Sequence, residues 1–374
     1  MKSLLIKNQN FFVGLLLTLL TIIITLIIAE IILRFTPYKN IGLSYKYPAQ
    51  YFIADDEMGY DIRQNRKGAI HNLPDHPYEV FSNSYGCFDY ERKVPNNYGL
   101  IVGDSFTWGY SPLDDKWTSY LEKKSGIFMM KCGITGHGTL QEMKKAKRVI
   151  KAIGKNPKYV IVLYTANDFN DDFFFPGRTV IGDGTLVSKN KGANFITGER
   201  FFYSQEEQEE RKKKYMSFKY SLVTYRIFLS ASTQIKNKFE EFLSHKNPTA
   251  RSDMPDFITN YYGICLASYF NYTDREWYNQ ALEQHLKNIK DFALYSRSIG
   301  AKFLFIDLSG TLQNPRIDNL KKFFASHQGM YFYDLSTDYK NPSHWKHDSH
   351  WDIKGNQEAG EFIYQNFKKA GVFE

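Results

Sequence analysis

A serine directly follows a short apolar run near residue 100. The run Tyr98–Val102 has the length of a strand and is followed by the motif Gly103-Asp104-Ser105-Phe106-Thr107-Trp108-Gly109. At a strand-to-helix turn the serine hydroxyl is exposed at the edge of the sheet, and its backbone N–H points to where an oxyanion would form. Because Thr107 replaces the second glycine, the motif is not the Gly-x-Ser-x-Gly elbow of α/β-hydrolases. A capped turn alone would also explain it.

A histidine-rich segment near the C-terminus contains a candidate base. Residues 344–351 are HWKHDSHW. A histidine beside a carboxylate in a loop can act as an oriented general base, which makes His350 and Asp348 the candidate pair. Asp352 is a second, poorer candidate for the carboxylate. Three histidines spaced by three also suggest a metal site, but a loop preceded by proline gives them no common face. We therefore expect no metal.

Two further polar clusters follow apolar runs. Residues 132–139 are CGITGHGT, in which glycines let the backbone approach a ligand closely. Residues 164–171 are YTANDFND, in which an asparagine side chain can donate a hydrogen bond to an oxyanion. Each also has a simpler explanation, a glycine-rich turn for the first cluster and helix capping for the second.

The elements that would position these clusters alternate between strand and helix. Continuous apolar runs indicate strands buried on both faces, and they lie at 98–102, 127–131, 159–163, 301–307 and 330–334. Helical periodicity is present at 117–124, 140–153, 277–298 and 353–367. This pattern predicts an α/β fold, a doubly wound, flavodoxin-like parallel sheet of about five strands flanked by helices. The polar clusters would then gather at the carboxyl ends of the strands.

Taken together, the four clusters resemble the conserved blocks of the SGNH (GDSL-like) hydrolase superfamily. The resemblance is carried by GDSFTWG, ITGHGT, TANDFND and HDSHWDIKGN. In addition, FSNSYGCFD at 81–89 resembles a segment that often precedes the first block in membrane-anchored members. The resemblance covers about 81–172 and 301–370. Thr165 stands where the family often has glycine, and Asp348 is separated from the histidine by one residue rather than two.

The resemblance implies a role for each matching residue. Ser105 would be the nucleophile, His350 its base, and Asp348 the group that orients the imidazole. The oxyanion hole would consist of the Ser105 N–H, the Gly136 N–H and the Asn167 side-chain amide. The implied chemistry is acyl transfer without a metal or an organic cofactor.

The N-terminus contains a long apolar segment. After a short tail at 1–10, residues 11–33 are long enough to cross a bilayer. Because no small-x-small cleavage site is present, we interpret the segment as a single-pass transmembrane signal anchor. The positive charges on its two sides are nearly equal in number. We expect the large domain on the periplasmic or extracellular side, since the tail is short.

The remaining chain divides into three parts. Residues 34–98 are expected to form an irregular lead-in, and 99–374 the SGNH hydrolase domain. Between the third and fourth predicted strands an insertion at about 173–275 is longer than a normal crossover. The charged stretch 205–214 and the amphipathic stretch 220–242 predict that it is helical. It would either cover the site as a lid or decorate the fold.

Composition excludes some partners and leaves others open. The formal net charge is +8, but lysine and arginine are scattered and no nucleic-acid-binding motif is present, so we expect no nucleic-acid partner. Aromatic residues make up 17% of the chain, which fits either stacking on sugar rings or an aromatic core. None of the cysteines, Cys87, Cys132 and Cys265, forms a CxxC pair, so neither a zinc site nor a disulfide framework is predicted.

These observations favour a serine esterase that removes acyl groups, with acetyl preferred, from a carbohydrate or cell-surface polysaccharide. Two alternatives remain open at this point. The same residues could serve an O-acyltransferase that receives its acyl group from a partner membrane protein, or a non-catalytic glycan-binding protein on the same scaffold. Lipid esters are a further class of substrate, given the apolar segment.

Overall fold

The computed structural model describes residues 2–36, 47–48, 50–73, 75–181, 184–194, 196–215, 222–229, 231–232, 235, 257–258, 275–308, 315–346 and 348–373. Two compact units are present, one formed by 1–45 with 210–254 and the other by 46–209 with 255–374. The second unit contains all the polar clusters that the sequence singled out.

A five-stranded parallel sheet forms the centre of the second unit. Its strands are β5 (Tyr98–Gly103), β6 (Phe128–Lys131), β7 (Tyr159–Tyr164), β13 (Lys302–Asp307) and β14 (Met330–Asp334), in the order β14-β13-β7-β5-β6. Counted along the chain this is the order 2-1-3-4-5 of flavodoxin-like folds, so the predicted fold class is confirmed. Every residue of β5 and β7 is buried, which is why these runs are apolar without alternation.

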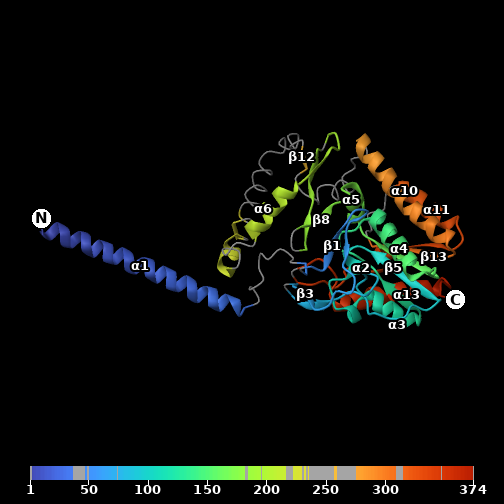
Figure 1. Cartoon of the computed structure of the whole chain (residues 1–374), viewed down its shortest axis with the longest axis horizontal. Coiled ribbons are helices and arrows are strands. Elements are labelled where there is room, and N and C mark those ends of the chain that lie inside the picture. Colours follow the sequence, from blue (N-terminus) through green and yellow to red (C-terminus); the bar gives the residue numbers. More distant parts are fainter. Residues whose placement is uncertain are drawn as a thin grey trace. The chain divides into compact units, whose positions relative to one another are not determined.

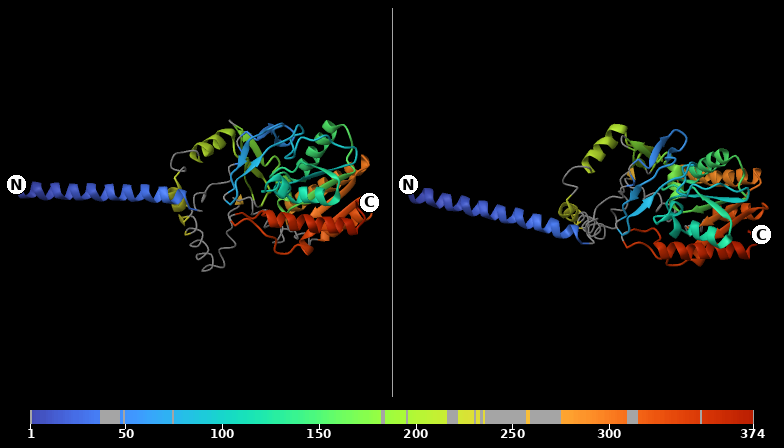
Figure 2. Two further views of the ribbon diagram at one scale, coloured as in Figure 1. Left: turned by 90° about the horizontal axis from the view of Figure 1, so that it is seen from below. Right: turned by 60° about the horizontal axis from the view of Figure 1, so that its bottom comes forward.

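Helices cover both faces of this sheet. One face is covered by α4 (Thr139–Ile153), α10 (Glu276–Ser298) and α11 (Pro315–Ala325), whose apolar side chains form one core cluster with the strands. The other face is covered by α3 (Trp117–Ser125) and α13 (Ile353–Lys369), which form a second cluster. Figure 1 shows these two layers, and Figure 2 shows α13 (red) beside α3. The predicted helices therefore exist, with ends shifted by a few residues at most.

The segment before the sheet contains short antiparallel strand pairs. Strand β1 (Phe52–Asp55) pairs with β2 (Gly59–Ile62), and β3 (Ala69–His71) pairs with β4 (Tyr78–Val80). Their buried aromatic residues pack with Trp108 and Tyr110 in a third core cluster. The lead-in thus packs directly behind the residues that follow Ser105.

The described part of the insertion at about 173–275 contains more strand than the sequence indicated. Helix α6 (Gln205–Tyr215) agrees with the prediction, but five short strands accompany it. They are β8 (Arg178–Ile181), β9 (Thr185–Ser188), β10 (Asn190–Asn194), β11 (Arg200–Phe202) and β12 (Phe257–Ile258). Strands of two to five residues are too short to show a clear period of two. Most of the predicted amphipathic stretch 220–242 lies outside the described residues.

Helix α1 (Lys2–Arg34) belongs to the first unit and contains the apolar segment. Residues Phe12–Arg34 are long and apolar enough to span a membrane or to form a signal sequence, with a mean hydropathy of 2.9. Near its end, Glu30 accepts hydrogen bonds of 3.0 Å from the backbone N–H groups of Val223 and Thr224. The carboxylate thereby caps the start of the helical stretch 223–229 within the same unit.

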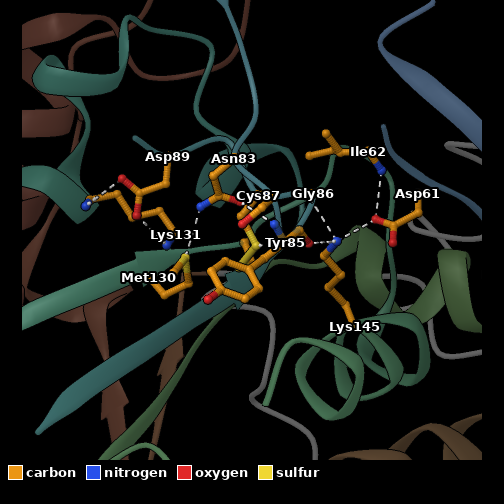
Figure 3. The surroundings of a disulfide bond; sticks show 12 residues. Asp61, Ile62, Asn83, Tyr85, Gly86, Cys87, Asp89, Met130, Lys131 and Lys145 are labelled. Carbon is orange, nitrogen blue, oxygen red and sulfur yellow. Dashed lines mark hydrogen bonds and ion pairs between the residues drawn. A yellow bond between two sulfur atoms is a disulfide. The ribbon is translucent and has the colours of Figure 1, made fainter. Parts of the chain in front are cut away.

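A disulfide bond joins Cys87 to Cys132, with 4.4 Å between their Cα atoms (Figure 3). The spacing of the cysteines had indicated no disulfide framework, and it did not reveal this bond. The two residues are 45 positions apart, and their pairing depends on how the lead-in crosses the end of β6. Asn83 shapes the loop before Cys87 by accepting hydrogen bonds from the N–H groups of Tyr85 and Cys87, at 3.0 and 3.1 Å. Cys132 begins the glycine-rich loop that leads to Gly136.

Candidate active site

Ser105 lies at the carboxyl end of β5, where the strand turns into the short helix α2 (Ser105–Trp108). The side chain of Asp104 caps this helix by accepting a 2.9 Å hydrogen bond from the N–H of Phe106. Gly103 has a φ of 152°, and any side chain there would collide with Thr107. The strand order reverses between β5 and β7, so Ser105 lies at the crevice where such sheets bind ligands.

His350 lies within hydrogen-bond distance of the serine. The distance from His350 Nε2 to Ser105 Oγ is 2.7 Å. The other ring nitrogen, Nδ1, contacts Asp348 Oδ1, which also accepts a 2.6 Å hydrogen bond from the His350 backbone N–H. The Tyr110 ring stacks on the imidazole at a centroid distance of 3.7 Å and an interplanar angle of 6°. The three residues therefore form a connected serine–histidine–aspartate array with a fixed imidazole plane.

Asp352, the second candidate for the carboxylate, is used elsewhere. It is the N-cap of α13, where its side chain accepts a 2.8 Å hydrogen bond from the Gly355 N–H. Its other oxygen accepts a 2.5 Å hydrogen bond from the Ser343 hydroxyl. Helix capping explains this residue, whereas Asp348 contacts the imidazole.

The glycine-rich loop packs against the serine turn. The N–H of Ile134 donates a 2.9 Å hydrogen bond to the carbonyl of Gly103. A side chain on Gly133 would lie 2.5 Å from the Trp108 nitrogen, so glycine is required for this close approach. Gly136, the predicted oxyanion donor, has a φ of 71° in the left-handed region. The loop therefore reaches the neighbourhood of Ser105 by direct backbone packing.

Asn167, the other predicted oxyanion donor, is the first residue of α5 (Asn167–Phe173). Its side-chain amide donates to Asp104 Oδ2 at 3.0 Å and to Asp171 Oδ2 at 3.1 Å. Asp104 Oδ2 also accepts from the Ser105 hydroxyl at 3.3 Å. The structure thus brings Asn167 next to Ser105, but both amide hydrogens are donated to carboxylates. A substrate oxyanion would compete with these carboxylates for them.

Carboxyl groups gather beneath the site. Burial raises the pKa of Glu142 and of Asp168 well above the usual range, and the nearby charge of Asp104 adds to both shifts. Neither oxygen of the Glu142 carboxyl has a hydrogen-bond partner within the described part of the chain. The surroundings of these two groups therefore favour their neutral forms.

Two other histidines near the site are poor bases. Burial lowers the pKa of His71 and of His137 to about 3. His71 Nδ1 lies 3.0 Å from the Tyr78 hydroxyl, and His137 Nε2 lies 3.2 Å from the Tyr60 backbone carbonyl. Of these three histidines, His350 contacts the serine.

Sequence reasoning missed several residues around the array. The hydroxyls of Tyr47, Tyr110 and Thr135 lie 3.2–3.3 Å from one another. Arg178 Nη1 donates a 2.7 Å hydrogen bond to the Tyr47 hydroxyl. Tyr110 follows the serine motif closely and could have been noticed as an aromatic neighbour. Arg178 comes from the insertion, where no sequence signal distinguished it.

No metal site was expected. Of the three histidines that suggested one, the structure describes only His344 and His350. His347 lies outside the described residues. Within the ranges that the structure describes, no group of three or more histidine, cysteine or acidic residues is arranged to hold a metal ion. The expectation of a metal-free site stays a prediction.

No family model and no curated protein matches the chain. Similar solved structures include a protein of Desulfitobacterium hafniense DCB-2 that is described as a putative lipolytic protein of the G-D-S-L family. It is 13% identical to this chain, the match covers 72% of this chain and 99% of that one, and the TM-score is 0.36. The acetyl xylan esterase Est2A of Butyrivibrio proteoclasticus has 11% identity, coverages of 76% and 66%, and a TM-score of 0.37. A carbohydrate esterase family 2 enzyme of Corynascus thermopiles has 11% identity, coverages of 79% and 74%, and a TM-score of 0.32. Values this low carry no argument about reaction or substrate, so the functional conclusion depends on the geometry around Ser105.

Proposed function

We propose that the chain is a serine-dependent esterase of the SGNH type that removes acyl groups, with acetyl preferred, from a carbohydrate. The observation that carries this proposal is the connected array of Ser105, His350 and Asp348, with 2.7 Å between the serine oxygen and the imidazole. A nucleophile, its base and the group orienting the base within hydrogen-bond distance are the arrangement that acyl transfer requires.

The first half of the reaction acylates the serine. Ser105 Oγ attacks the ester carbonyl as its proton passes to His350 Nε2, and Asp348 holds the Nδ1–H tautomer and stabilises the imidazolium. The carbonyl electrons move to the oxygen, which accepts hydrogen bonds from the N–H groups of Ser105 and Gly136 and from the Asn167 amide. His350 then returns the proton to the leaving sugar oxygen as the carbon–oxygen bond breaks.

The second half releases the acyl group. Water attacks the acyl-serine while His350 takes one of its protons, and the collapse of the second tetrahedral intermediate returns a proton to Ser105 Oγ. Transfer to a sugar hydroxyl would use the same steps with that hydroxyl in place of water. An O-acyltransferase would therefore use the same residues in the same roles and would differ only in the acceptor of the acyl group.

A carbohydrate substrate is supported by aromatic side chains beside His350. Trp345, on the same loop, is partly buried and stacks with His76 at a centroid distance of 5.5 Å and an interplanar angle of 10°. Its indole N–H is fixed by a 2.9 Å hydrogen bond to the Tyr110 carbonyl. A partly exposed indole held in place on the loop that contains His350 suits contact with the apolar face of a sugar ring.

The compartment we propose is outside the cytoplasm, with the chain held to the membrane by α1. The apolar segment Phe12–Arg34 supports insertion. The disulfide between Cys87 and Cys132 supports an oxidising compartment, because such bonds persist in the periplasm and outside cells.

The test compares the full-length wild-type chain and Ser105→Ala, both purified in detergent, on 4-nitrophenyl acetate and on acetylated xylan. We expect acetate release by the wild type and a loss of about 10³-fold or more in the variant. Ser188→Ala, at an exposed serine of β9, is the matched control and should keep wild-type turnover. Equal turnover in Ser105→Ala would overturn the proposal, and acetyl transfer to added oligosaccharide in excess of hydrolysis would identify a transferase.

A further inference from the structure

Arg178 brings a permanent positive charge from the insertion to the predicted oxyanion site. A side chain on Gly136 would lie 2.6 Å from Arg178 Nε and 2.7 Å from Cζ, so the guanidinium packs directly on the glycine Cα. Gly136 supplies one of the backbone N–H groups that the esterase proposal assigns to the oxyanion hole. The charge therefore lies against the residue whose N–H the esterase proposal assigns to the oxyanion hole.

Two tyrosines link the guanidinium to the candidate general base. Arg178 Nη1 donates to the Tyr47 hydroxyl at 2.7 Å, and this hydroxyl lies 3.2 Å from that of Tyr110. Tyr110 in turn stacks on His350 at 3.7 Å. A cation held through a stacked and hydrogen-bonded chain to the general base is preorganised with respect to the reacting atoms.

The site also needs a cation on electrostatic grounds. The amide hydrogens of Asn167 are donated to Asp104 and Asp171, and the carboxylate of Asp104 lies 3.3 Å from the Ser105 hydroxyl. Negative charges this close to the nucleophile oppose the formation of a second negative charge on the carbonyl oxygen. A guanidinium beside Gly136 offsets that repulsion.

We propose that Arg178 is a further catalytic residue that stabilises the oxyanion of the tetrahedral intermediate by its charge, beside the N–H of Gly136. This role rests on the proposed esterase function. No proton moves to or from the guanidinium, because it stays charged throughout. The bond from Ser105 Oγ to the carbonyl carbon forms, the carbonyl electron pair moves to the oxygen, and Arg178 acts on that developing charge alone.

The experiment compares Arg178→Gln, Arg178→Lys and the control Arg200→Gln in the full-length chain. Arg200 belongs to the same insertion, is exposed and donates to the Phe173 carbonyl at 2.7 Å, so its loss tests the general effect of removing an arginine there. Turnover of 4-nitrophenyl acetate is measured, and so is the rate at which a fluorophosphonate labels the serine, followed by intact mass. Phosphonylation also develops negative charge on an oxygen, so labelling tests the role even without a natural substrate.

We expect Arg178→Gln to lower kcat and the labelling rate by about 10²-fold with little change in KM, because the interaction exists in the transition state and not in the ground state. Arg178→Lys should recover most of this loss, which a purely structural role would not explain. Equal kcat and labelling in Arg178→Gln and Arg200→Gln would overturn the role of Arg178. A raised KM confined to esters that carry a carboxylate would also overturn it, since Arg178 would then bind a substrate anion.

The two proposals fail in different ways. If the wild type is labelled at Ser105 and Arg178→Gln is labelled equally fast, the esterase site stands and the role of Arg178 is wrong. If a folded wild type is neither labelled nor active, and Ser105→Ala behaves identically, both proposals fail together.

Discussion

At the scale of single residues, two aspartates four positions apart have separate tasks. Asp348 contacts His350 through its side chain and accepts the 2.6 Å hydrogen bond of the histidine backbone. Asp352 caps α13 and accepts from Gly355 and Ser343. The two side chains are identical, so their different contacts come from the path of the backbone between them.

This separation predicts opposite effects for two matched variants. Asp348→Asn should lower kcat by about 10³-fold or more, because asparagine no longer holds the required imidazole tautomer, while the melting temperature changes little. The measurement is turnover of 4-nitrophenyl acetate together with thermal unfolding.

Asp352→Asn is the control, and it should leave kcat within a few-fold of the wild type. Asparagine can still cap the helix, whereas Asp352→Ala should lose about 1 kcal/mol of stability because the cap is removed. Loss of activity in Asp352→Asn with full activity in Asp348→Asn would reverse the assignment.

At the scale of elements, parallel strands place the reactive side chains at one edge of the sheet, and a helix that starts there contains a buried carboxyl group. Strands β5 and β7 are adjacent and parallel, so Ser105 and Asn167 emerge at the same edge. Helix α4 begins at this edge and turns Glu142 into the interior. A buried carboxyl is therefore a consequence of where α4 starts.

Glu142 gives stability a predictable pH dependence. Burial raises its pKa above the value in the unfolded chain, so the folded state retains a proton that the unfolded state releases. The stability from this group is complete below the unfolded pKa and is lost as the pH rises toward the folded pKa. Glu142→Gln stays neutral, so its stability relative to that of the wild type should rise between about pH 4 and about pH 8.

The measurement is the free energy of unfolding in urea at the two pH values. Glu79→Gln, at an exposed position of β4, is the control and should show the same difference from the wild type at both. Destabilisation by Glu142→Gln near pH 8 would mean that the carboxyl is ionised and favourably placed in the folded state, contrary to the raised pKa.

At the scale of the whole molecule, a disulfide ties the lead-in to the sheet next to the site. Cys132 follows β6 and begins the loop that contains Gly136, while Cys87 belongs to the segment before β5. Both cysteines are fully buried. The bond therefore restrains the start of the glycine-rich loop.

Removing this bond should destabilise the second unit. The variant carrying Cys87→Ala and Cys132→Ala should lose about 3–4 kcal/mol, the size expected for closing a loop of this length. A reducing agent should lower the wild-type unfolding midpoint and leave the variant unchanged. Cys265→Ala, at the third cysteine, is the control for stability. Unfolded wild-type protein should show one free thiol in the absence of reductant. Three free thiols without reductant would contradict the disulfide.

The sequence by itself determined the strands of the sheet and the helices that cover it. These signals are local, because a strand buried on both faces must be apolar throughout and an amphipathic helix must repeat its apolar residues every three or four positions. Because each follows a predicted strand, the polar clusters around Ser105, Gly136 and Asn167 could be assigned to strand ends, and the cluster around His350 to the loop before the last helix.

The tertiary structure decided what depends on segments far apart in the chain. The pairing of Cys87 with Cys132, the contact of Arg178 with Gly136 and the carboxylate partners of Asn167 each join elements that no local pattern relates. The short strands of the insertion pair with one another, so tertiary pairing rather than periodicity defines them. Side chains are placed by packing and hydrogen bonds among distant residues, and such contacts exist only once the chain has folded.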